Sequence, residues 1–406
     1  MSWDVRPCTS LAEQRDAMSA IWHYFGRAAP GEDQLESLSH LIPRERLHAA
    51  RDGDGIVGGA GAFPFQLTVP GNRIPAAGVT VVGVQPTHRR RGVLGAMMRA
   101  QLDDVRARGE SVAYLWASEE RIYGRFGYGL ASLTGEIDVA REHTALDAPR
   151  VEPFGRARLV PLAEAEPLVA PVWERVAADT PGMFARSSAW WRTRTLTDPD
   201  WRRAGGGELR CVVLEADRGP IAHALYRFTP AFDRGVANGT LQVVEAIGDS
   251  PRATRAIWRY LLDMDLVGRV RAAQLPLDHP LFLLAAEPRY LRFSVRDGLW
   301  VRLVDVGAAL AVRAYAGAGS VVVDVADAFC PWNAGRWRVG DGGAARTTDA
   351  PDLRCDVTAL GSVYLGGFTW TQQAAALRVE ALGPGAVERA DALFRTDRLP
   401  WCPEIF

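Results

Sequence analysis

Residues Val79–Ala100 read VTVVGVQPTHRRRGVLGAMMRA, and the rest of the chain is interpreted outward from this stretch. The β-branched run from Val79 to Val84 is short and closed by Pro86, which predicts a buried strand. From Val93 onward, apolar residues recur at three- and four-residue spacing, which predicts a helix. The basic run from Arg89 to Gly92 lies where this helix begins.

The basic run at the helix start predicts an anion site. The first helical N–H groups have no intrahelical acceptor, and the helix dipole is positive at this end, so phosphate is the usual guest. A solvated basic surface is the alternative. No Gly-Lys-Ser/Thr follows the run and the Rossmann glycine spacing is absent, so neither of those nucleotide motifs is present. Gly83, inside the valine strand, predicts a bulge or the close approach of another backbone.

Taken together, the strand, its glycine, the arginine turn and the helix resemble the acyl-coenzyme A site of the GNAT N-acetyltransferase family. In that family a splayed strand pairs with the pantetheine arm, and an Arg/Gln-x-x-Gly-x-Gly/Ala turn holds the pyrophosphate. Here the turn runs from Arg89 to Leu94, and Leu94 replaces the final small residue.

Length and composition narrow the class of protein. At 406 residues the chain is long for one core, which predicts two or three domains. The net charge of −1 argues against nucleic acid or an anionic membrane as a partner. The 5 cysteines are scattered without a Cys-x-x-Cys, so we expect neither disulfides nor a metal site. No signal-like segment and no apolar run of about 18 residues is present, so we expect a cytoplasmic protein without a membrane partner.

Residues 1–135 predict an α/β domain, the acetyltransferase domain with the cofactor site. Thr9-Ser10 followed by Glu13 is a capping signature that predicts a helix through about Phe25. Strands are expected at 47–51 and 56–69 around an Asp-Gly turn, and at 111–116 after the central helix.

Residues 136–289 predict a second, degenerate domain of the same kind. A polar linker is expected near its start, at 141–156. Residues 240–264 again read as strand, turn and helix, with Asp249 or Ser250 as the cap and Pro251 at the first helical position. An aspartate at that helix start would satisfy the N–H groups and repel phosphate, so this copy is expected to lack a cofactor site. Core packing is expected for its tryptophans, with a substrate-channel wall as the alternative: Trp190, Trp191 and Trp201.

Residues 290–406 resemble a sterol-carrier-like α+β domain. Strands are expected at 300–306, 320–325 and 336–339, and helices at about 371–382 and 387–395. The tail at 399–406 carries two prolines and four large apolar side chains, so we expect it to be buried although terminal residues are usually disordered.

Two GNAT-like units followed by a sterol-carrier-like module resemble, over essentially the whole chain, the Eis family of acetyltransferases. The most specific pieces are the stretches at 79–94, 117–129 and 360–366 and the final phenylalanine. The resemblance implies an α/β (α+β) fold of tandem GNAT-like domains with a sterol-carrier-like C-terminal domain. It also implies acetyl-CoA as cosubstrate, a homo-hexamer, and acetylation of amines on aminoglycosides or other small polyamines.

The same resemblance assigns roles to individual residues. It implies Tyr123 as general acid and the free α-carboxylate of Phe406 as general base. It places acetyl-CoA against Val82, Gly83, Val84, Arg90, Arg91, Gly92, Val93, Leu94, Gly95, Ser118 and Glu119. A structural, hydrogen-bonded tyrosine is the alternative for Tyr123.

Those roles suit the reaction. A protonated amine must lose a proton before it attacks the thioester, and an α-carboxyl with an ordinary pKa of about 3.5 is ionised and able to accept it. The leaving thiolate needs a proton, which a tyrosine with an ordinary pKa of about 10 still carries. Backbone N–H groups near Gly83 are expected to polarise the thioester carbonyl.

The residues expected around the amine depart from the family pattern. The family places an acid next to the terminal phenylalanine, but here that neighbour is Ile405, and Glu404 is expected to point elsewhere in an extended tail. The helix expected to supply another acid reads WHYF at 22–25, in which His23 is either a pocket residue or a structural one. Two other functions stay open: a peptide or protein N-acetyltransferase, and a non-catalytic protein whose C-terminal module binds a lipid.

Overall fold

The computed structural model describes residues 3–147, 154–203 and 205–406. Contacts divide the chain into two units. Unit 1 comprises residues 1–132, 298–398 and 406, and unit 2 comprises residues 133–297 and 399–405. The predicted division at 135 and 289 stays a prediction, and the middle of the predicted linker, 148–153, lies outside the described residues.

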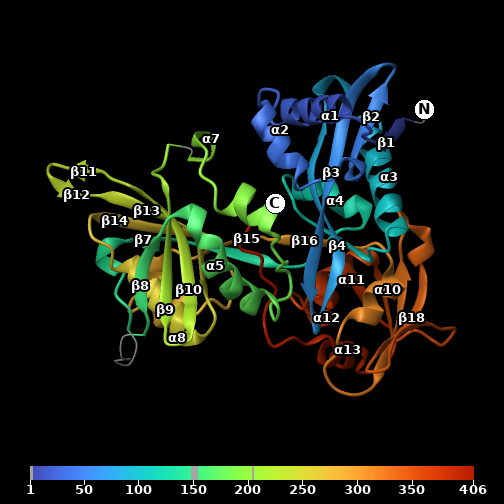
Figure 1. Cartoon of the computed structure of the whole chain (residues 1–406). Helices are drawn as coiled ribbons and strands as arrows, with labels where there is room; N and C mark the ends of the chain where they lie inside the picture. The colour runs from blue at the N-terminus through green and yellow to red at the C-terminus, as the bar shows by residue number, and fades with distance from the viewer. Residues whose placement is uncertain (1–2, 148–153, 204) are drawn as a thin grey trace. The chain divides into compact units, whose positions relative to one another are not determined.

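The N-terminal part of unit 1 is a mixed sheet with helices on both faces (Figure 1). Its strands, in spatial order, are β1 (Asp4–Pro7), β2 (Leu47–Asp52), β3 (Gly55–Val69), β4 (Asn72–Val84), β5 (Val112–Trp116), β16 (Leu299–Leu303) and β6 (Gly129–Leu130). Its helices are α1 (Leu11–Tyr24), α2 (Glu32–Ser39), α3 (Val93–Ala107) and the short α4 (Glu120–Tyr123).

The predicted capping signature at the start of α1 is confirmed. Ser10 Oγ accepts a hydrogen bond from the Glu13 N–H at 3.2 Å, and the Glu13 carboxylate accepts one from the Thr9 N–H at 2.7 Å. On the opposite face, α3 buries Met97 and Met98 against the apolar residues of β3 and β4. Two buried helices therefore fix the path of β4, the strand predicted from the valine run.

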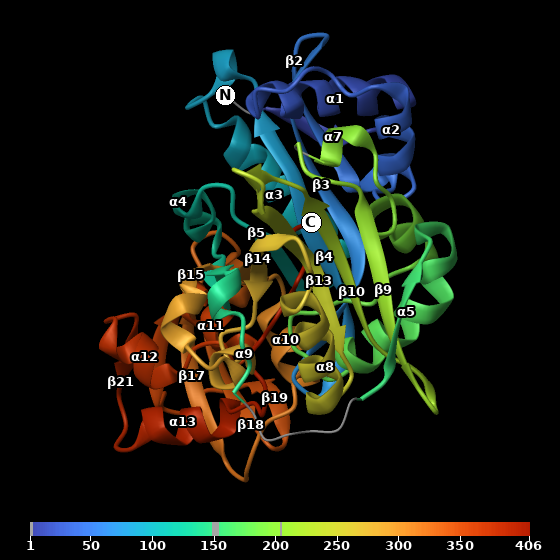
Figure 2. The same ribbon diagram turned by 90° about the vertical axis from the view of Figure 1, so that its left-hand side faces the viewer.

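Unit 2 repeats this plan on a second sheet (Figure 2). Its strands, in spatial order, are β8 (Arg156–Val160), β9 (Leu209–Ala216), β10 (Gly219–Thr229), β13 (Gly239–Gly248), β14 (Val267–Leu275), β7 (Leu133–Ala140) and β15 (Ser294–Asp297). A small hairpin pairs β11 (Phe232–Asp233) with β12 (Val236–Ala237). The helices are α5 (Leu162–Ala177), α6 (Ser188–Trp190), α7 (Asp200–Arg203), α8 (Pro251–Leu262) and α9 (Leu281–Leu284).

Alternation along β9 sends successive side chains to opposite cores. Val212 packs in a cluster with Ile257 of α8, while Val213 packs in another with Trp173 of α5. The predicted tryptophan packing is confirmed for Trp190 and Trp191, which are 2% exposed. It is wrong for Trp201 on α7, which is 55% exposed. The aromatic character of a residue was therefore not sufficient to predict its burial.

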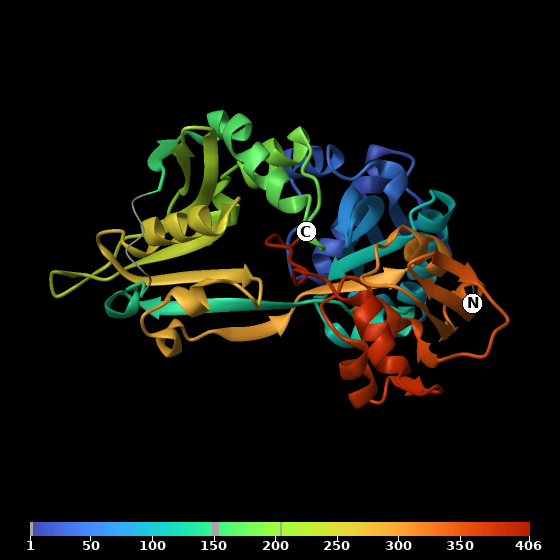
Figure 3. The same cartoon turned by 90° about the horizontal axis from the view of Figure 1, so that it is seen from below.

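Two strands, β15 and β16, follow residue 290, where the predicted C-terminal domain begins. The first of them, β15, pairs with β7, and the two run side by side in Figure 3. The next strand, β16, pairs antiparallel with β5 and with β6. These two strands therefore belong to the sheets of the GNAT-like units.

The remaining C-terminal part of unit 1 has its own sheet, with β19 (Gly343–Arg346), β18 (Gly335–Gly340), β17 (Ser320–Ala326), β20 (Leu353–Asp356) and β21 (Val379–Ala381) in spatial order. Its helices are α10 (Val306–Val312), α11 (Val357–Tyr364), α12 (Trp370–Ala375) and α13 (Ala386–Phe394). The predicted helix at 371–382 is too long: Leu377 has a φ of 59°, and the chain then enters β21.

Candidate active site

The site begins where β4 and β5 part. These parallel strands pair at Ala76–Val112, Ala77–Ala113 and Gly78–Tyr114, and β4 continues to Val84 without β5 beside it. From Val79 to Val84, β5 does not pair with β4, so the backbone N–H and C=O groups on that side of β4 can pair with a ligand. Backbone polar groups need such partners when they are buried. This is the splayed strand that the family resemblance implies.

A bulge lies within the free part of β4. The pairing with β3 passes from Gly61–Thr80 to Gly59–Gly83, so that Val81 and Val82 both oppose Ala60. Val81 has a φ of 47°, which is unusual for a β-branched residue and costs of order 1–3 kcal/mol. Strain of this kind persists where surrounding packing dictates it, and bulges often lie beside functional sites.

Two glycines accommodate the bulge. A Cβ on Gly61 would lie 2.8 Å from Val81 Cγ2, and a Cβ on Gly83 would lie 3.0 Å from the Ile21 Cα of α1. The sequence-based interpretation of Gly83 is confirmed on both counts, because the strand bulges two residues earlier and another backbone comes close.

The arginine turn leads into an open helix end. Arg90 and Gly92 have φ values of 60° and 87°, and Gly92, the N-cap of α3, has no side chain with which to cap the first N–H groups. A pocket of about 600 Å³ opens at this point, and its walls include the residues from Gly92 to Gly95. A helix start with free N–H groups facing a pocket is suited to a phosphate.

Charged and aromatic side chains complete the pocket. The Arg89 guanidinium lies 4.8 Å from the centroid of the Tyr24 ring, and the Tyr24 hydroxyl donates a hydrogen bond to Glu119 Oε1 at 2.7 Å. Burial and the neighbouring Glu119 raise the pKa of Tyr24. The His88 ring is held by Asp52, with Nε2 and Oδ2 3.0 Å apart.

Most of the residues implied for acetyl-CoA lie on the pocket wall. Those on the wall are Val84, Arg90, Gly92, Val93, Leu94, Gly95 and Glu119. Val82 and Gly83 lie on β4, and Ser118 lies between β5 and α4, but these three residues do not line this pocket. Arg91 points elsewhere: its guanidinium lies 5.4 Å from the centroid of the Trp3 ring, and its carbonyl accepts a hydrogen bond from Trp3 Nε1. Their contacts with the cofactor stay predictions.

Tyr123 ends α4, just beyond β5, and is 6% exposed. Burial raises its pKa to about 12, against the opposing effect of a hydrogen bond with the Ser118 side chain. Its ring packs edge-on against Tyr128, with centroids 5.8 Å apart. The phenol therefore keeps its proton at neutral pH, as a general acid must and as a structural tyrosine also would.

Phe406 packs where β4 and β5 part. Its ring centroid lies 4.9 Å from that of Tyr114, 5.1 Å from Phe65 and 6.4 Å from Phe63. A Cβ on Gly78 would lie 3.3 Å from the Phe406 ring. The terminal phenylalanine is therefore fixed beside the last paired residues of the two strands and is 7% exposed.

The structure also shows where the other tail residues lie. Cys402 and Pro403 are buried as expected, but Ile405 is 52% exposed, so burial of the whole tail was too broad a prediction. Glu404 forms an ion pair with Arg186 in unit 2, at 2.7 Å. His23 is exposed near the end of α1, and it is not on the pocket wall.

The corresponding helix start in unit 2 is closed. Ser250, one of the two predicted caps, accepts a hydrogen bond from the Ala253 N–H, and Pro251 is the first helical residue. Asp249 does not cap but pairs with Arg175 and Arg218. The first turn of α8 therefore differs from that of α3, because Pro251 has no N–H group and the Ala253 N–H is bound by Ser250.

Comparisons with known proteins agree with this geometry. Profiles of the acetyltransferase (GNAT) domain match residues 4–131 and 182–303, and a sterol carrier protein domain profile matches residues 306–403. The chain is 44% identical to an uncharacterized N-acetyltransferase of Streptomyces avermitilis, over 94% of each chain. It is 35% identical to the N-acetyltransferase Eis of Mycobacterium tuberculosis, over 90% of this chain and 91% of that protein.

The chain belongs to the Eis family of GNAT N-acetyltransferases. The crystal structure of Eis1 from Mycobacterium abscessus superimposes with a TM-score of 0.86 at 36% identity, over 99% of this chain and 100% of that one. The predicted fold, tandem GNAT domains followed by a sterol-carrier-like domain, is confirmed. This Eis-family chain is an acyltransferase, and GNAT acetyltransferases use acetyl-CoA.

Several pocket residues were not among those predicted: Tyr24, His88, Arg89, Ile122, Arg125 and Phe126. Arg89 is the first residue of the predicted turn and His88 precedes it, but neither was among the residues implied for the cofactor. Tyr24 lies far away in the sequence, and no local pattern connects α1 with Glu119.

Within the described ranges, which omit residues 1–2, 148–153 and 204, no helix is both long and apolar enough to cross a bilayer. The same residues contain no group of His, Cys, Asp and Glu side chains arranged to hold a metal ion.

Proposed function

We propose that this Eis-family enzyme transfers the acetyl group of acetyl-CoA to an amine of an aminoglycoside-like or other polyamine small molecule. The observation that carries the proposal is the combination of the parted β4 and β5 with the uncapped start of α3. The first offers an extended backbone to the pantetheine arm, and the second offers free N–H groups to the pyrophosphate.

Arg89 and Arg90 add positive charge beside these N–H groups and favour the charged pyrophosphate. The lining of the pocket suits the cosubstrate, since the polar groups lie at the helix start while Val84, Ile122 and Phe126 provide apolar walls. Pantetheine needs both backbone partners and apolar contact along its length, so the pocket matches its chemistry.

The proposed reaction is a direct transfer. The amine nitrogen attacks the thioester carbon, forming the C–N bond and a tetrahedral oxyanion that backbone N–H groups of the bulged β4 stabilise. As the C–S bond breaks, the departing thiolate takes the proton of Tyr123, whose raised pKa has kept that proton in place. The proton of the amine passes to the α-carboxylate of Phe406, the general base.

Phe406 is suited to this role because its buried ring fixes the residue beside the strands that would hold the thioester. We further propose a homo-hexamer and a cytoplasmic location, with no nucleic acid or membrane partner. Cys8, Cys211, Cys330, Cys355 and Cys402 are all buried free thiols, which fits a reducing compartment.

A thiol-release assay tests the proposal. Purified enzyme is incubated with acetyl-CoA and a panel of aminoglycosides, polyamines and peptides, and free coenzyme A is followed spectroscopically. Steady release with small polyamines is the expected result. Release only with peptides would favour a peptide N-acetyltransferase, and none with any amine would favour the non-catalytic lipid-binding alternative.

A further inference from the structure

The sheet of unit 2 contains a second opening between parallel strands. β13 and β14 are paired from Gly239–Val267 to Val243–Ala272, after which β14 continues along β7 to Leu275 without β13. The pairing of β13 with β10 steps from Val243 to Glu245, which leaves Val244 as a bulge. Unit 2 therefore repeats both features of β4 and β5: a parting of parallel strands and a bulge beside it.

In unit 2 this opening is bordered by the C-terminal tail of the same chain. Trp401 Nε1 donates a hydrogen bond to the Gln274 carbonyl at 2.5 Å, beyond the last pair of β13 and β14. The Trp401 N–H donates a second one to Pro181 at 2.8 Å. Gln274 has a φ of 52°, a left-handed conformation that interrupts the regular strand here. The tail is thus hydrogen-bonded to the separated part of β14.

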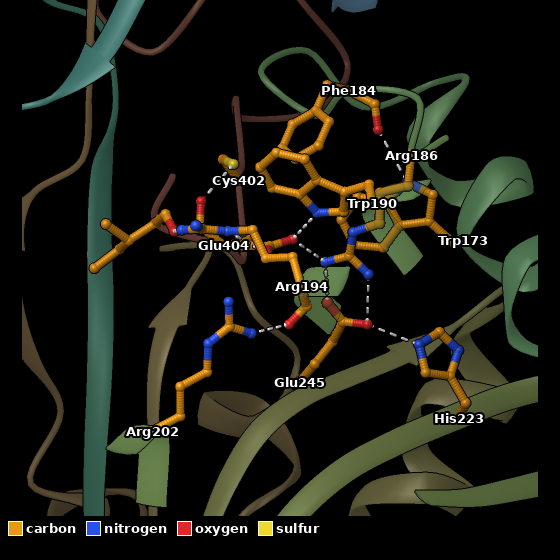
Figure 4. Close-up of polar contacts among 11 residues, drawn as sticks. Trp173, Phe184, Arg186, Trp190, Arg194, Arg202, His223, Glu245, Cys402 and Glu404 are labelled. Carbon is orange, nitrogen blue, oxygen red and sulfur yellow. Dashed lines mark hydrogen bonds and ion pairs between the residues drawn. The ribbon is translucent and has the colours of Figure 1, made fainter. Parts of the chain in front are cut away.

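On the β13 side of the opening, ion pairs between side chains connect the sheet to the tail (Figure 4). Glu245, on the separated part of β13, binds Arg186 with both carboxylate oxygens, at 3.0 and 2.5 Å. The same guanidinium pairs with Glu404 of the tail at 2.7 Å. Arg186 is 1% exposed at its side chain and lies 3.3 Å from the centroid of the Trp173 ring, so this ion pair is shielded from water.

Further contacts fix Glu404 and the residue after it. Trp190 Nε1 donates to Glu404 Oε2 at 2.9 Å, and Arg194 lies 3.3 Å from the other carboxylate oxygen. Arg194 also donates to the Ile405 carbonyl at 2.7 Å. Glu404 is therefore held through its side chain, as Figure 4 shows, and Ile405, which precedes Phe406, is held through its backbone carbonyl.

The charged and polar groups around Glu245 shift its pKa. Burial alone would raise it, but the charge of Arg186 and the hydrogen bonds from His223 and Arg186 lower it to about 2. His223, on β10, is fully buried with Nε2 2.8 Å from Glu245. Release of the tail would break the contacts of Glu404 with Arg186, Arg194 and Trp190 Nε1, whereas Arg186 would stay paired with Glu245.

We propose that the second GNAT unit, which lacks an open helix start, is a clamp for the C-terminal tail, with Glu404 as a positioning residue for the Phe406 carboxylate. The proposal rests on the proposed role of Phe406 as base. Glu404 is not a catalytic residue, because it acts only through the backbone of Ile405 and Phe406. Holding Ile405 leaves the terminal carboxylate few conformations, which lowers the entropic cost of placing it for proton transfer.

A second acyl-CoA at this opening is the competing occupant, and the contacts argue against it. A Cβ on Gly248 would lie 2.3 Å from the Thr254 nitrogen, so backbone packs tightly where a pyrophosphate would need room. The helix start is capped by Ser250. The clamp therefore predicts one acetyl-CoA per chain by isothermal titration calorimetry, and a stoichiometry of two would overturn it.

The direct test is Glu404→Gln, which keeps the shape of the side chain and removes its charge. The matched control is Glu142→Gln, an exposed carboxylate of unit 2. Carboxypeptidase Y digestion followed by intact-mass spectrometry measures release of Phe406 from the folded protein. We expect release at least about 10-fold faster in Glu404→Gln than in the wild type or the control, because a loosened end is cleaved through its open population.

Kinetics give the second readout. With acetyl-CoA and a reactive polyamine, Glu404→Gln should lower kcat about 10–100-fold, as expected for a misplaced catalytic group, with the Kd of acetyl-CoA unchanged. An unchanged rate of Phe406 release would overturn the clamp. Faster release with unchanged kcat would overturn the positioning role.

Two further variants separate the possible failures. If Glu404→Gln does not fold, Trp190→Phe removes a single donor to Glu404 while keeping an aromatic ring, and the same two readouts apply. Addition of one glycine after Phe406 tests the base itself. If that extension leaves kcat intact, the proposed base is wrong, whereas the clamp is still decided by the carboxypeptidase result.

Discussion

Extending the chain by a single glycine after Phe406 is the perturbation to which the proposed mechanism is most sensitive. If the phenylalanine ring stays among Phe63, Phe65 and Tyr114, the carboxylate moves outward by one residue, about 3.5 Å. If instead the carboxylate keeps its place, the ring must leave its contacts, which costs about 2–3 kcal/mol of apolar burial. Neither arrangement retains both the charge and the ring.

A general base acts within about 2.6–3.2 Å of the proton it accepts, and positioned proton transfer contributes roughly 10²–10⁴-fold. We therefore expect the extended enzyme to lose kcat on that scale, with the Kd of acetyl-CoA unchanged. The assay is steady-state thiol release, with the terminus verified by intact mass. An N-terminal glycine extension is the control, and Phe406→Ala, which keeps a carboxylate, should retain part of the activity. An extended, folded enzyme that acetylates at the original rate would refute the reasoning.

Four further outcomes follow from the same geometry. Gly92→Val should raise the Kd of acetyl-CoA about 10-fold or more, because a left-handed φ costs a branched residue about 1–2 kcal/mol and the side chain would crowd the helix start; Gly342→Ala, in open space, should not. Tyr123→Phe should lower kcat about 10²-fold without changing that Kd. Since the pKa of Tyr123 is raised to about 12, wild-type kcat should not fall near pH 10, where an ordinary tyrosine ionises, and a fall there would contradict its role as acid. Arg302→Met leaves the buried Asp327 without its ion-pair partner and should lower the free energy of unfolding, measured by urea titration, by about 3–5 kcal/mol. A change below about 1 kcal/mol would contradict a stabilising role for this ion pair.

Local patterns predicted the parts of the fold that depend on local chemistry. The cap at Ser10, the valine strand and the helix after Gly92 all follow from residues within a few positions of one another. Gly83 predicted a bulge or a close backbone, and both are present. The positive φ of Val81 could not be predicted, because it results from the packing of α1, β3 and β4 together.

Contacts between distant segments were missed for the same reason. Strand β16 pairs with β5 because it fills an open edge, and nothing in its own sequence names that partner. The partners of Glu404 were not predicted from the sequence. These are Arg186 and Arg194, which belong to a region that was interpreted only for its tryptophans. Helix α12 ends early because Leu377 turns left-handed, although the apolar spacing continues beyond it.

The pairing of β16 with β5, a strand far earlier in the sequence, has a consequence for synthesis on the ribosome. Strand β5 leaves the ribosome long before β16, its antiparallel neighbour, which is translated roughly 180 residues later; at 5–20 residues per second this is a delay on the order of 10–40 seconds. During that interval β5 presents an unpaired edge to other nascent chains. A fragment that stops at residue 135 would keep this edge permanently, so truncation to the first domain should yield aggregation instead of a minimal enzyme.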